Sequence, residues 1–245
     1  MSTSLLAPSF ASPSHLVPML QQHGQVALSP QGVAELAGCG LDDLLALQSD
    51  WQDLPPDEYL KDGGRYRRRR HSCFVVQGEQ AQLAPHRPHW QPVEYNALHG
   101  GMQRFFEPMH AATVGQPVWR QLLVWLGRVC SACKGEQPWY VEAHQFRIDT
   151  TDGIGRPTPE GAHRDGVDFV AVFLVGRHNV KGGETRVFDA TGPNGQRFTL
   201  TEPWSLLLLD DGKVIHESTP IQPTGPGGYR DTLVLTYRAG GFQGG

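Results

Sequence analysis

The second half of the chain is a succession of short apolar segments separated by turn residues. One of them, residues 169–175, is too short for a buried helix and too rich in β-branched residues to prefer one. Such segments at regular spacing, with Gly, Pro and Asp between them, predict an antiparallel barrel or sandwich rather than a parallel sheet with alternating helices. The predicted strands cover residues 139–148, 169–175, 185–188, 204–209, 213–218 and 230–237.

Two of these segments are joined by Asp210-Asp211-Gly212. An Asp-Gly pair between two apolar runs is a strong short-range signal for a tight hairpin. We therefore expect strands 204–209 and 213–218 to pair with each other.

The first half carries helix signals. In residues 29–37, Ser29 is suited to the N-cap and Pro30 to the first helical position, where its missing N–H costs nothing. Residues 41–47 and 118–133 are also predicted helices, and the chain before residue 28 is expected to be irregular. We expect these helices to pack on one outer face of the sheet structure.

No internal repeat or linker divides the chain. We therefore predict one domain over residues 1–245, in which residues 1–138 supply supporting helices and strands and residues 139–238 form the functional core. The expected class is mainly β with helices (α+β).

Composition limits the possible partners. Hydrophobic residues make up 39% and charged residues 19% of the chain, as in ordinary globular proteins, and the net charge of -4 gives no electrostatic basis for binding nucleic acid or an anionic membrane. No apolar run reaches the roughly 18 residues of a membrane span. Because the first 20 residues contain three prolines and no Lys or Arg, they do not resemble a secretory signal, and we expect a cytoplasmic location.

Four cysteines are present, and two of them, Cys130 and Cys133, lie one helical turn apart. This spacing is found in redox dithiols and in half of a zinc site, but no second closely spaced Cys/His pair accompanies it. We interpret them as small buried or half-buried thiols.

The strongest chemical signal is a pair of potential metal ligands, His163 and Asp165. Two residues apart on an extended backbone, their side chains point to the same side, at the entrance to strand 169–175. A third candidate, His216, lies on the later strand 213–218. Two histidines and one carboxylate with open coordination positions are the ligand set of non-haem Fe(II) oxygenases. The alternative is that these are unrelated polar residues on strands.

Arg230 begins the last strand, 14 positions after His216. A planar guanidinium beside the metal could hold the far carboxylate of a dicarboxylate cosubstrate whose other end chelates the metal. Arg238, at the end of the same strand, is the competing candidate. A salt bridge between Arg230 and a neighbouring acid is the structural alternative.

Residues 65–70 contain five arginines and lead into a predicted strand at 72–76. Alternate residues of a strand face opposite sides, so Arg67 and Arg69 could face inward toward a substrate carboxylate. The other interpretation is a solvated strand edge. We interpret the aromatic residues of Gln103-Arg104-Phe105-Phe106 as core residues, and the polar loop 149–160 as a possible lid.

The chain resembles the Fe(II)/2-oxoglutarate dioxygenases, and more narrowly a bacterial group of free-amino-acid hydroxylases that includes L-isoleucine 4-hydroxylase. The resemblance is firm over residues 139–238 and fainter before, at Arg65-Tyr66-Arg67 and at residues 103–106. It rests on His144-Gln145-Phe146-Arg147, Pro159-Glu160-Gly161, His163-Arg164-Asp165, Gly182-Gly183-Glu184, His216-Glu217-Ser218-Thr219-Pro220 and Tyr229-Arg230-Asp231-Thr232-Leu233-Val234-Leu235-Thr236.

This resemblance implies a double-stranded β-helix (jelly-roll) core with Fe(II) bound by His163, Asp165 and His216 and with 2-oxoglutarate bound by Arg230. The implied activity is hydroxylation of a small molecule, with a free amino acid expected, and dioxygen as the second substrate; a homo-oligomer is compatible with it. Two alternatives are a cupin-like metalloenzyme that does not use 2-oxoglutarate and a metal-free binding module on a jelly roll.

Overall fold

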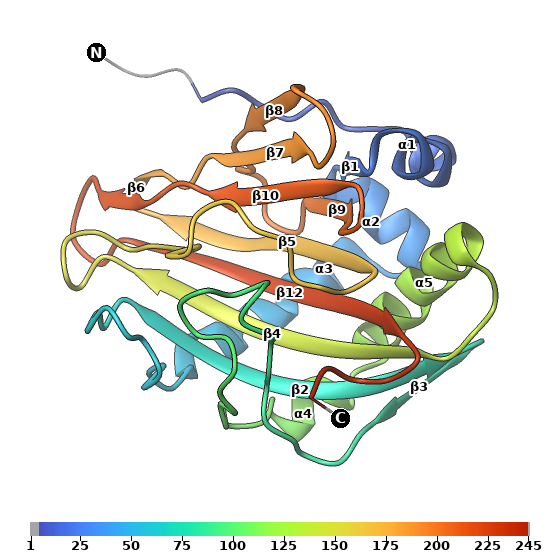
Figure 1. The fold of residues 1–245 in the computed structure, drawn as a ribbon, viewed down its shortest axis with the longest axis horizontal. Helices are drawn as coiled ribbons and strands as arrows, with labels where there is room; N and C mark the ends of the chain where they lie inside the picture. The colour runs from blue at the N-terminus through green and yellow to red at the C-terminus, as the bar shows by residue number, and fades with distance from the viewer. Residues whose placement is uncertain (1–4, 245) are drawn as a thin grey trace.

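Two facing β-sheets, with helices on the outer side of the larger one, make up the computed structural model, which describes residues 5–244 (Figure 1). All strand pairs within the sheets are antiparallel. The larger sheet has seven strands in the order β1 (Gln25–Leu28), β9 (Leu206–Asp210), β5 (Phe169–His178), β12 (Tyr229–Ala239), β4 (Trp139–Asp149), β2 (Arg67–Gln77) and β3 (Gln80–Leu83).

The smaller sheet covers part of the opposite face. It consists of β10 (Val214–Ser218), β7 (Thr185–Asp189) and β8 (Gly195–Phe198), and is accompanied by the two-stranded pair β11 (Ile221–Pro223) and β6 (Val180–Gly182). The predicted mainly β, jelly-roll architecture is confirmed.

The helices are η1 (Pro13–His15), α1 (Leu16–His23), α2 (Pro30–Ala37), α3 (Leu41–Ala46), η2 (Leu47–Asp53), α4 (Ala111–Val114) and α5 (Pro117–Lys134). The three predicted helices correspond to α2, α3 and α5. At the start of α2, the Ser29 hydroxyl accepts a hydrogen bond from the Gly32 N–H at 3.2 Å, as expected of an N-cap. No helix in residues 5–244 is long and apolar enough to cross a membrane.

The prediction of an irregular start before residue 28 was wrong, because α1 and β1 lie there. The signal for β1 is weak because the strand has only four residues, and pairing with β9 makes it part of the sheet. Helix α1 buries Leu16 and Leu20 against the same core.

The predicted hairpin at Asp210-Asp211-Gly212 was also wrong. Strand β9 pairs with β1 and β5 in the larger sheet, whereas β10 pairs with β7 in the smaller one, so this turn crosses from one sheet to the other. The local Asp-Gly signal specifies a turn, but the pairing of the strands depends on their neighbours.

Alternation along β5 separates two cores. Phe169, Ala171 and Phe173 pack toward the helices, whereas Val170 and Leu174 pack between the two sheets. The interpretation of the cysteine pair is confirmed: Cys130 is buried and Cys133 half-buried against the helix-side core, and both are free thiols.

Strand β4 alternates as well. Its Val141 and Ala143 join the helix-side core, while Glu142, His144 and Phe146 project to the opposite side, where a cavity opens between the sheets. This cavity contains the candidate functional site.

Candidate active site

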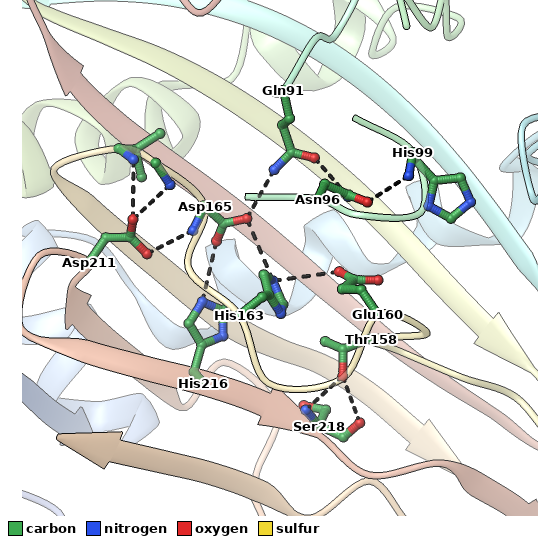
Figure 2. Close-up of polar contacts among 12 residues, drawn as sticks. Gln91, Asn96, His99, Thr158, Glu160, His163, Asp165, Asp211, His216 and Ser218 are labelled. Atoms are coloured by element: carbon green, nitrogen blue, oxygen red, sulfur yellow. Dashed lines mark hydrogen bonds and ion pairs between the residues drawn. The ribbon is translucent and has the colours of Figure 1, made fainter. Parts of the chain in front are cut away.

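The three residues predicted as metal ligands lie together at this cavity. His163 and His216 face each other through two backbone hydrogen bonds of 3.0 and 2.9 Å, which connect the loop before β5 to β10. Asp165 Oδ2 lies 3.3 Å from His216 Nε2, and its Oδ1 lies 3.7 Å from His163 Nε2 (Figure 2). One ligand atom from each residue falls within 4.8 Å of the others.

Hydrogen bonding prepares His163 for a metal. Its Nδ1 lies 2.9 Å from the Gly161 carbonyl oxygen, which can only accept, so Nδ1 carries a proton and Nε2 is the ring nitrogen that faces Asp165 and is placed to ligate a metal. In metal-bound histidines, the ring nitrogen that does not bind the metal commonly donates to a backbone carbonyl oxygen.

The electrostatics of the trio favour a bound cation. Burial alone would lower the pKa of His163, but the hydrogen bond and charge of Asp165, with the charge of Glu160, raise it to about 10. Burial would raise the pKa of Asp165, but hydrogen bonds from His163 and His216 hold it far below its ordinary value. Two imidazoles and a carboxylate match the donor set of Fe(II), so these residues fit that ion.

Asp211, in the turn between the sheets, holds the loop that carries Asp165. Its two carboxylate oxygens accept hydrogen bonds from the backbone N–H groups of Asp165, Gly166 and Val167 at 2.9, 2.8 and 3.2 Å (Figure 2). Gly166 has a φ of +75°, which favours glycine, and Tyr95 packs where its side chain would lie. The loop therefore has little freedom to carry Asp165 away.

We expect the Asp211→Asn substitution to weaken divalent-metal binding by roughly 10- to 100-fold, the range typical of residues that orient metal ligands. The amide places N–H groups against backbone N–H groups, so part of this support is lost. Titration with Co(II), followed by absorption, measures the affinity. Asp210→Asn is the matched control, because Asp210 instead contacts the Gly212 N–H and Lys213. Equal affinity in both variants would show that the loop needs no such support.

Two glutamines that the sequence did not indicate also hold Asp165. Gln91 Nε2 donates to Asp165 Oδ1 at 3.2 Å, while its Oε1 accepts from Asn96 and from Arg104, both at 3.0 Å. Gln243 Nε2 donates to the carbonyl oxygens of Asp165 and Gly166 at 3.0 and 2.7 Å.

From its sequence, a glycine-rich chain end such as residues 240–245 is expected to be frayed. That expectation is wrong as far as Gly244, because Gln243 is buried beside the loop that carries Asp165; Gly245 lies outside the described residues.

Arg230 lines the cavity and is 4% exposed. Its Nε is buried and has no hydrogen-bond partner within residues 5–244. Burial and then the charge of Arg177 lower its pKa to about 10. The neighbouring acid, Asp231, forms a two-point ion pair with Arg147 at 2.8 and 2.7 Å, so it leaves Arg230 available. The competing candidate, Arg238, is occupied by the carbonyl oxygens of residues 241 and 242.

The arginines of β2 divide as the strand alternation predicts. Arg67 and Arg69 line the cavity, and with Arg70 they are at most 7% exposed, so the solvated-edge interpretation is wrong for them. Asp57 accepts a 2.7 Å hydrogen bond from Arg67 Nε and lies 3.8 Å from Arg69.

Two aromatic rings and a histidine hold the Arg69 guanidinium. Its guanidinium carbon lies 3.8 Å from the ring centroid of Phe106 and 4.4 Å from that of Phe146, and its Nη2 donates to His144 Nδ1 at 2.7 Å. The core interpretation holds for Phe106 but was wrong for Phe105, which is 56% exposed.

Arg104 is a further cavity residue that sequence reasoning did not identify, although it lies within the segment 103–106 assigned to packing. It is 2% exposed, and its Nε has no hydrogen-bond partner among the described residues. Burial, followed by the charge of Arg67, lowers its pKa to about 10. A guanidinium this buried with unused donors is poised to bind an anion.

The loop 149–160 lines the cavity through Pro157, Thr158 and Glu160. Thr158 exchanges hydrogen bonds with the Ser218 backbone at 3.0 and 3.1 Å, which ties the loop to β10 (Figure 2). Its role as a lid stays a prediction.

Comparison with solved structures supports the fold. A BsmA homologue from Methylobium petroleophilum PM1 is 52% identical, with 97% of each chain covered and a TM-score of 0.91. IDO from Bacillus thuringiensis is 19% identical over 94% of this chain and 100% of its own, with a TM-score of 0.75. The Fe(II)/α-ketoglutarate-dependent dioxygenase TqaL is 20% identical over 95% of this chain and 88% of its own, with a TM-score of 0.73.

No curated protein matches the chain. The family model described as 2OG-Fe dioxygenase matches residues 48–236, a span that contains the predicted metal ligands, Arg230 and the arginines of β2. The chain therefore belongs to the 2OG-Fe dioxygenase family, whose members are oxidoreductases that use Fe(II) and 2-oxoglutarate.

Proposed function

We propose that this enzyme hydroxylates a free amino acid, with Fe(II) bound by His163, Asp165 and His216. The observation that carries the proposal is the charge pattern of the cavity: guanidinium groups with unused donors line the same space as carboxylates and the metal trio. Family membership sets aside the metal-free binding module and the metalloenzyme without 2-oxoglutarate.

Three protein ligands leave coordination positions open for a cosubstrate and dioxygen. When bound, Fe(II) together with 2-oxoglutarate supplies the dioxygen chemistry. The chain's own part is to hold and orient the reactants and to exclude water from them.

Arg230 is the proposed clamp for the 5-carboxylate of 2-oxoglutarate. It lies on β12 in register with Ile148 of β4, facing the cavity between the sheets. Its Nε has no hydrogen-bond partner within residues 5–244, and a guanidinium can form two parallel hydrogen bonds with a carboxylate.

The substrate carboxylate is proposed to bind at Arg67 and Arg104. Among the described residues, Arg67 Nη2 and Arg104 Nε are buried without a hydrogen-bond partner. Asp57 already compensates part of the charge on Arg67 and Arg69. Arg69, predicted together with Arg67 as a substrate contact, is engaged by His144 and two rings, so we assign it a supporting role.

An aliphatic side chain has a matching surface in the same cavity. Four valines line the cavity, from β5, β12 and the loop that carries Asp165: Val167, Val170, Val172 and Val234. Apolar walls with a few convergent polar groups are typical of sites for small molecules. This combination supports an amino acid with an apolar side chain.

The test is a screen of the twenty standard L-amino acids with Fe(II), 2-oxoglutarate and air, read by mass spectrometry. We expect at least one to gain a single oxygen atom, with a matching increase in succinate. If succinate forms but no amino acid is oxidised, the substrate class is wrong while the cosubstrate assignment stands.

Arg104→Met is expected to raise the KM for the amino acid by roughly 30-fold or more, because truncating one partner of a buried charge-assisted pair costs about 2–5 kcal/mol. The KM for 2-oxoglutarate should stay unchanged. Arg65→Met is the control, since Arg65 forms a surface ion pair with Asp152. Steady-state kinetics with each substrate varied in turn measures both constants. An unaltered amino-acid KM would remove Arg104 from the site.

A further inference from the structure

A second group of titratable side chains lies in the cavity wall, apart from the metal trio. His71 on β2, Glu142 and His144 on β4, and His89 on the connecting segment are all buried, with one nitrogen or oxygen of each within 4.8 Å of the others. Three of them, His89, Glu142 and His144, line the cavity. Three histidines and one carboxylate could hold a metal or could serve as a hydrogen-bonding site.

The hydrogen bonds argue against a metal. Arg69 can only donate, so the 2.7 Å contact with His144 Nδ1 makes that nitrogen the acceptor and leaves the proton on Nε2. A protonated Nε2 cannot ligate. His71 Nδ1 is buried and has no partner in residues 5–244, so His71 lacks the supporting acceptor that metal-bound histidines have.

The same hydrogen bonds make Glu142 and His89 an oriented pair. Glu142 Oε2 lies 2.5 Å from His89 Nδ1 and 3.0 Å from His71 Nε2. Burial would raise the pKa of Glu142, but its histidine neighbours hold it well below the ordinary value, while burial lowers the pKa of His89 to about 4. Glu142 is thus an anion, His89 is neutral, and the His89 proton lies on Nδ1.

This tautomer leaves His89 Nε2 as a lone-pair acceptor. The nitrogen has no hydrogen-bond partner among the described residues, and it is not fully buried. Because His89 lines the cavity, its available acceptor can face a bound molecule. A neutral imidazole oriented by a carboxylate is a strong acceptor for an N–H or O–H group.

His89 is connected to both the metal trio and Arg104. His89 and Gln91 are two residues apart, roughly 7 Å along an extended segment, and Gln91 donates to the metal-ligand candidate Asp165. His89 also forms a β-bridge with Arg104 through backbone hydrogen bonds of 2.9 and 3.0 Å. An acceptor and the Arg104 guanidinium thus come from paired residues that both line the cavity, an arrangement complementary to the ammonium and carboxylate groups of a zwitterion.

We propose that His89, oriented by Glu142, accepts a hydrogen bond from the α-ammonium group of the substrate while Arg104 binds its carboxylate, so that the enzyme selects free amino acids with an unsubstituted amine. This inference rests on the proposed function and extends it to a residue pair. His89 acts in binding, and Glu142 is a positioning residue that acts through it.

The test uses the full chain with Fe(II) and 2-oxoglutarate, and the amino acid that the wild-type enzyme oxidises best among the twenty standard ones. His89→Phe should raise the KM for that amino acid by roughly 10- to 100-fold, the value of a hydrogen bond to a charged group. Its N-acetyl derivative should be oxidised poorly by the wild type. His89→Gln, which restores an acceptor, should recover part of the loss, and a purely structural role would not produce that recovery.

Two controls separate the possible outcomes. His86→Phe changes an exposed histidine of the same segment and should match the wild type. The number of Co(II) ions bound per chain, measured for each variant, shows whether the metal site is intact. Oxidation of the amino acid by His89→Phe with an unchanged KM would overturn the inference while leaving the proposed function in place. If the wild type oxidises none of the twenty, both fail together.

The number of metal ions bound per chain tests the competing interpretation, in which the histidine and glutamate cluster is a second metal site. The wild type and Glu142→Gln should each bind one Co(II) per chain. Two ions in the wild type and one in Glu142→Gln would make the cluster a second metal site and would overturn the proposal.

Discussion

Asp165→Ala is expected to reduce divalent-metal affinity by more than about 100-fold, since changes in the residues that only orient metal ligands already cost 10- to 100-fold. Asp165 is the sole carboxylate of the trio, and it hydrogen-bonds with His216 and lies 3.7 Å from His163. Its loss removes the negative charge that neutralises the cation and leaves two imidazoles, which bind a divalent ion weakly.

Metal content after dialysis and Fe(II)-dependent succinate formation measure this effect. The substitution leaves the fold in place because Asp165 is half-buried at a cavity edge, and circular dichroism checks this. Asp152→Ala, which removes a carboxylate from a surface ion pair, is the control. Normal turnover by Asp165→Ala would contradict the assignment of Asp165 as a metal ligand.

Arg230→Ala is expected to raise the KM for 2-oxoglutarate by roughly 30- to 1,000-fold. The expected loss is about 2–4 kcal/mol, in the range for removing one partner of a buried, hydrogen-bonded charge pair. The effect arises because Arg230 lines the cavity and its buried Nε has no hydrogen-bond partner within residues 5–244, so the cosubstrate carboxylate is the proposed acceptor for this guanidinium.

Arg238→Ala provides the comparison, because it removes an arginine of the same strand whose donors are taken by backbone oxygens. Succinate formation over a range of 2-oxoglutarate concentrations gives the constant for each variant. A larger effect at Arg238 than at Arg230 would transfer the clamp to the end of β12.

Much of the architecture could be read from local patterns. Ser29 and Pro30 predicted where α2 begins, and the alternation of residues along β4 places Glu142 and His144 on the side opposite to Val141. These features depend on residues within a few positions of one another, so a single sequence contains all the information they need.

The proximity of the metal trio was predictable for a related reason. His163 and Asp165 are neighbours on an extended segment, and a turn-rich all-β chain brings a late strand such as β10 back to it. The arginine run could be interpreted only in part. Strand alternation placed Arg67 and Arg69 on one side, but the sequence did not indicate that Arg67 pairs with Asp57 or that Arg69 packs on two aromatic rings.

By itself, the sequence determined the order and type of most elements, the side of each strand that a residue faces, and the candidate ligands. The tertiary structure decided that β9 and β10 belong to different sheets, and that Gln91 and Gln243 meet at Asp165. It also placed Arg104 beside His89. Such contacts join residues tens of positions apart, and their formation depends on which strands pair and how the chain crosses between sheets, which no local preference specifies.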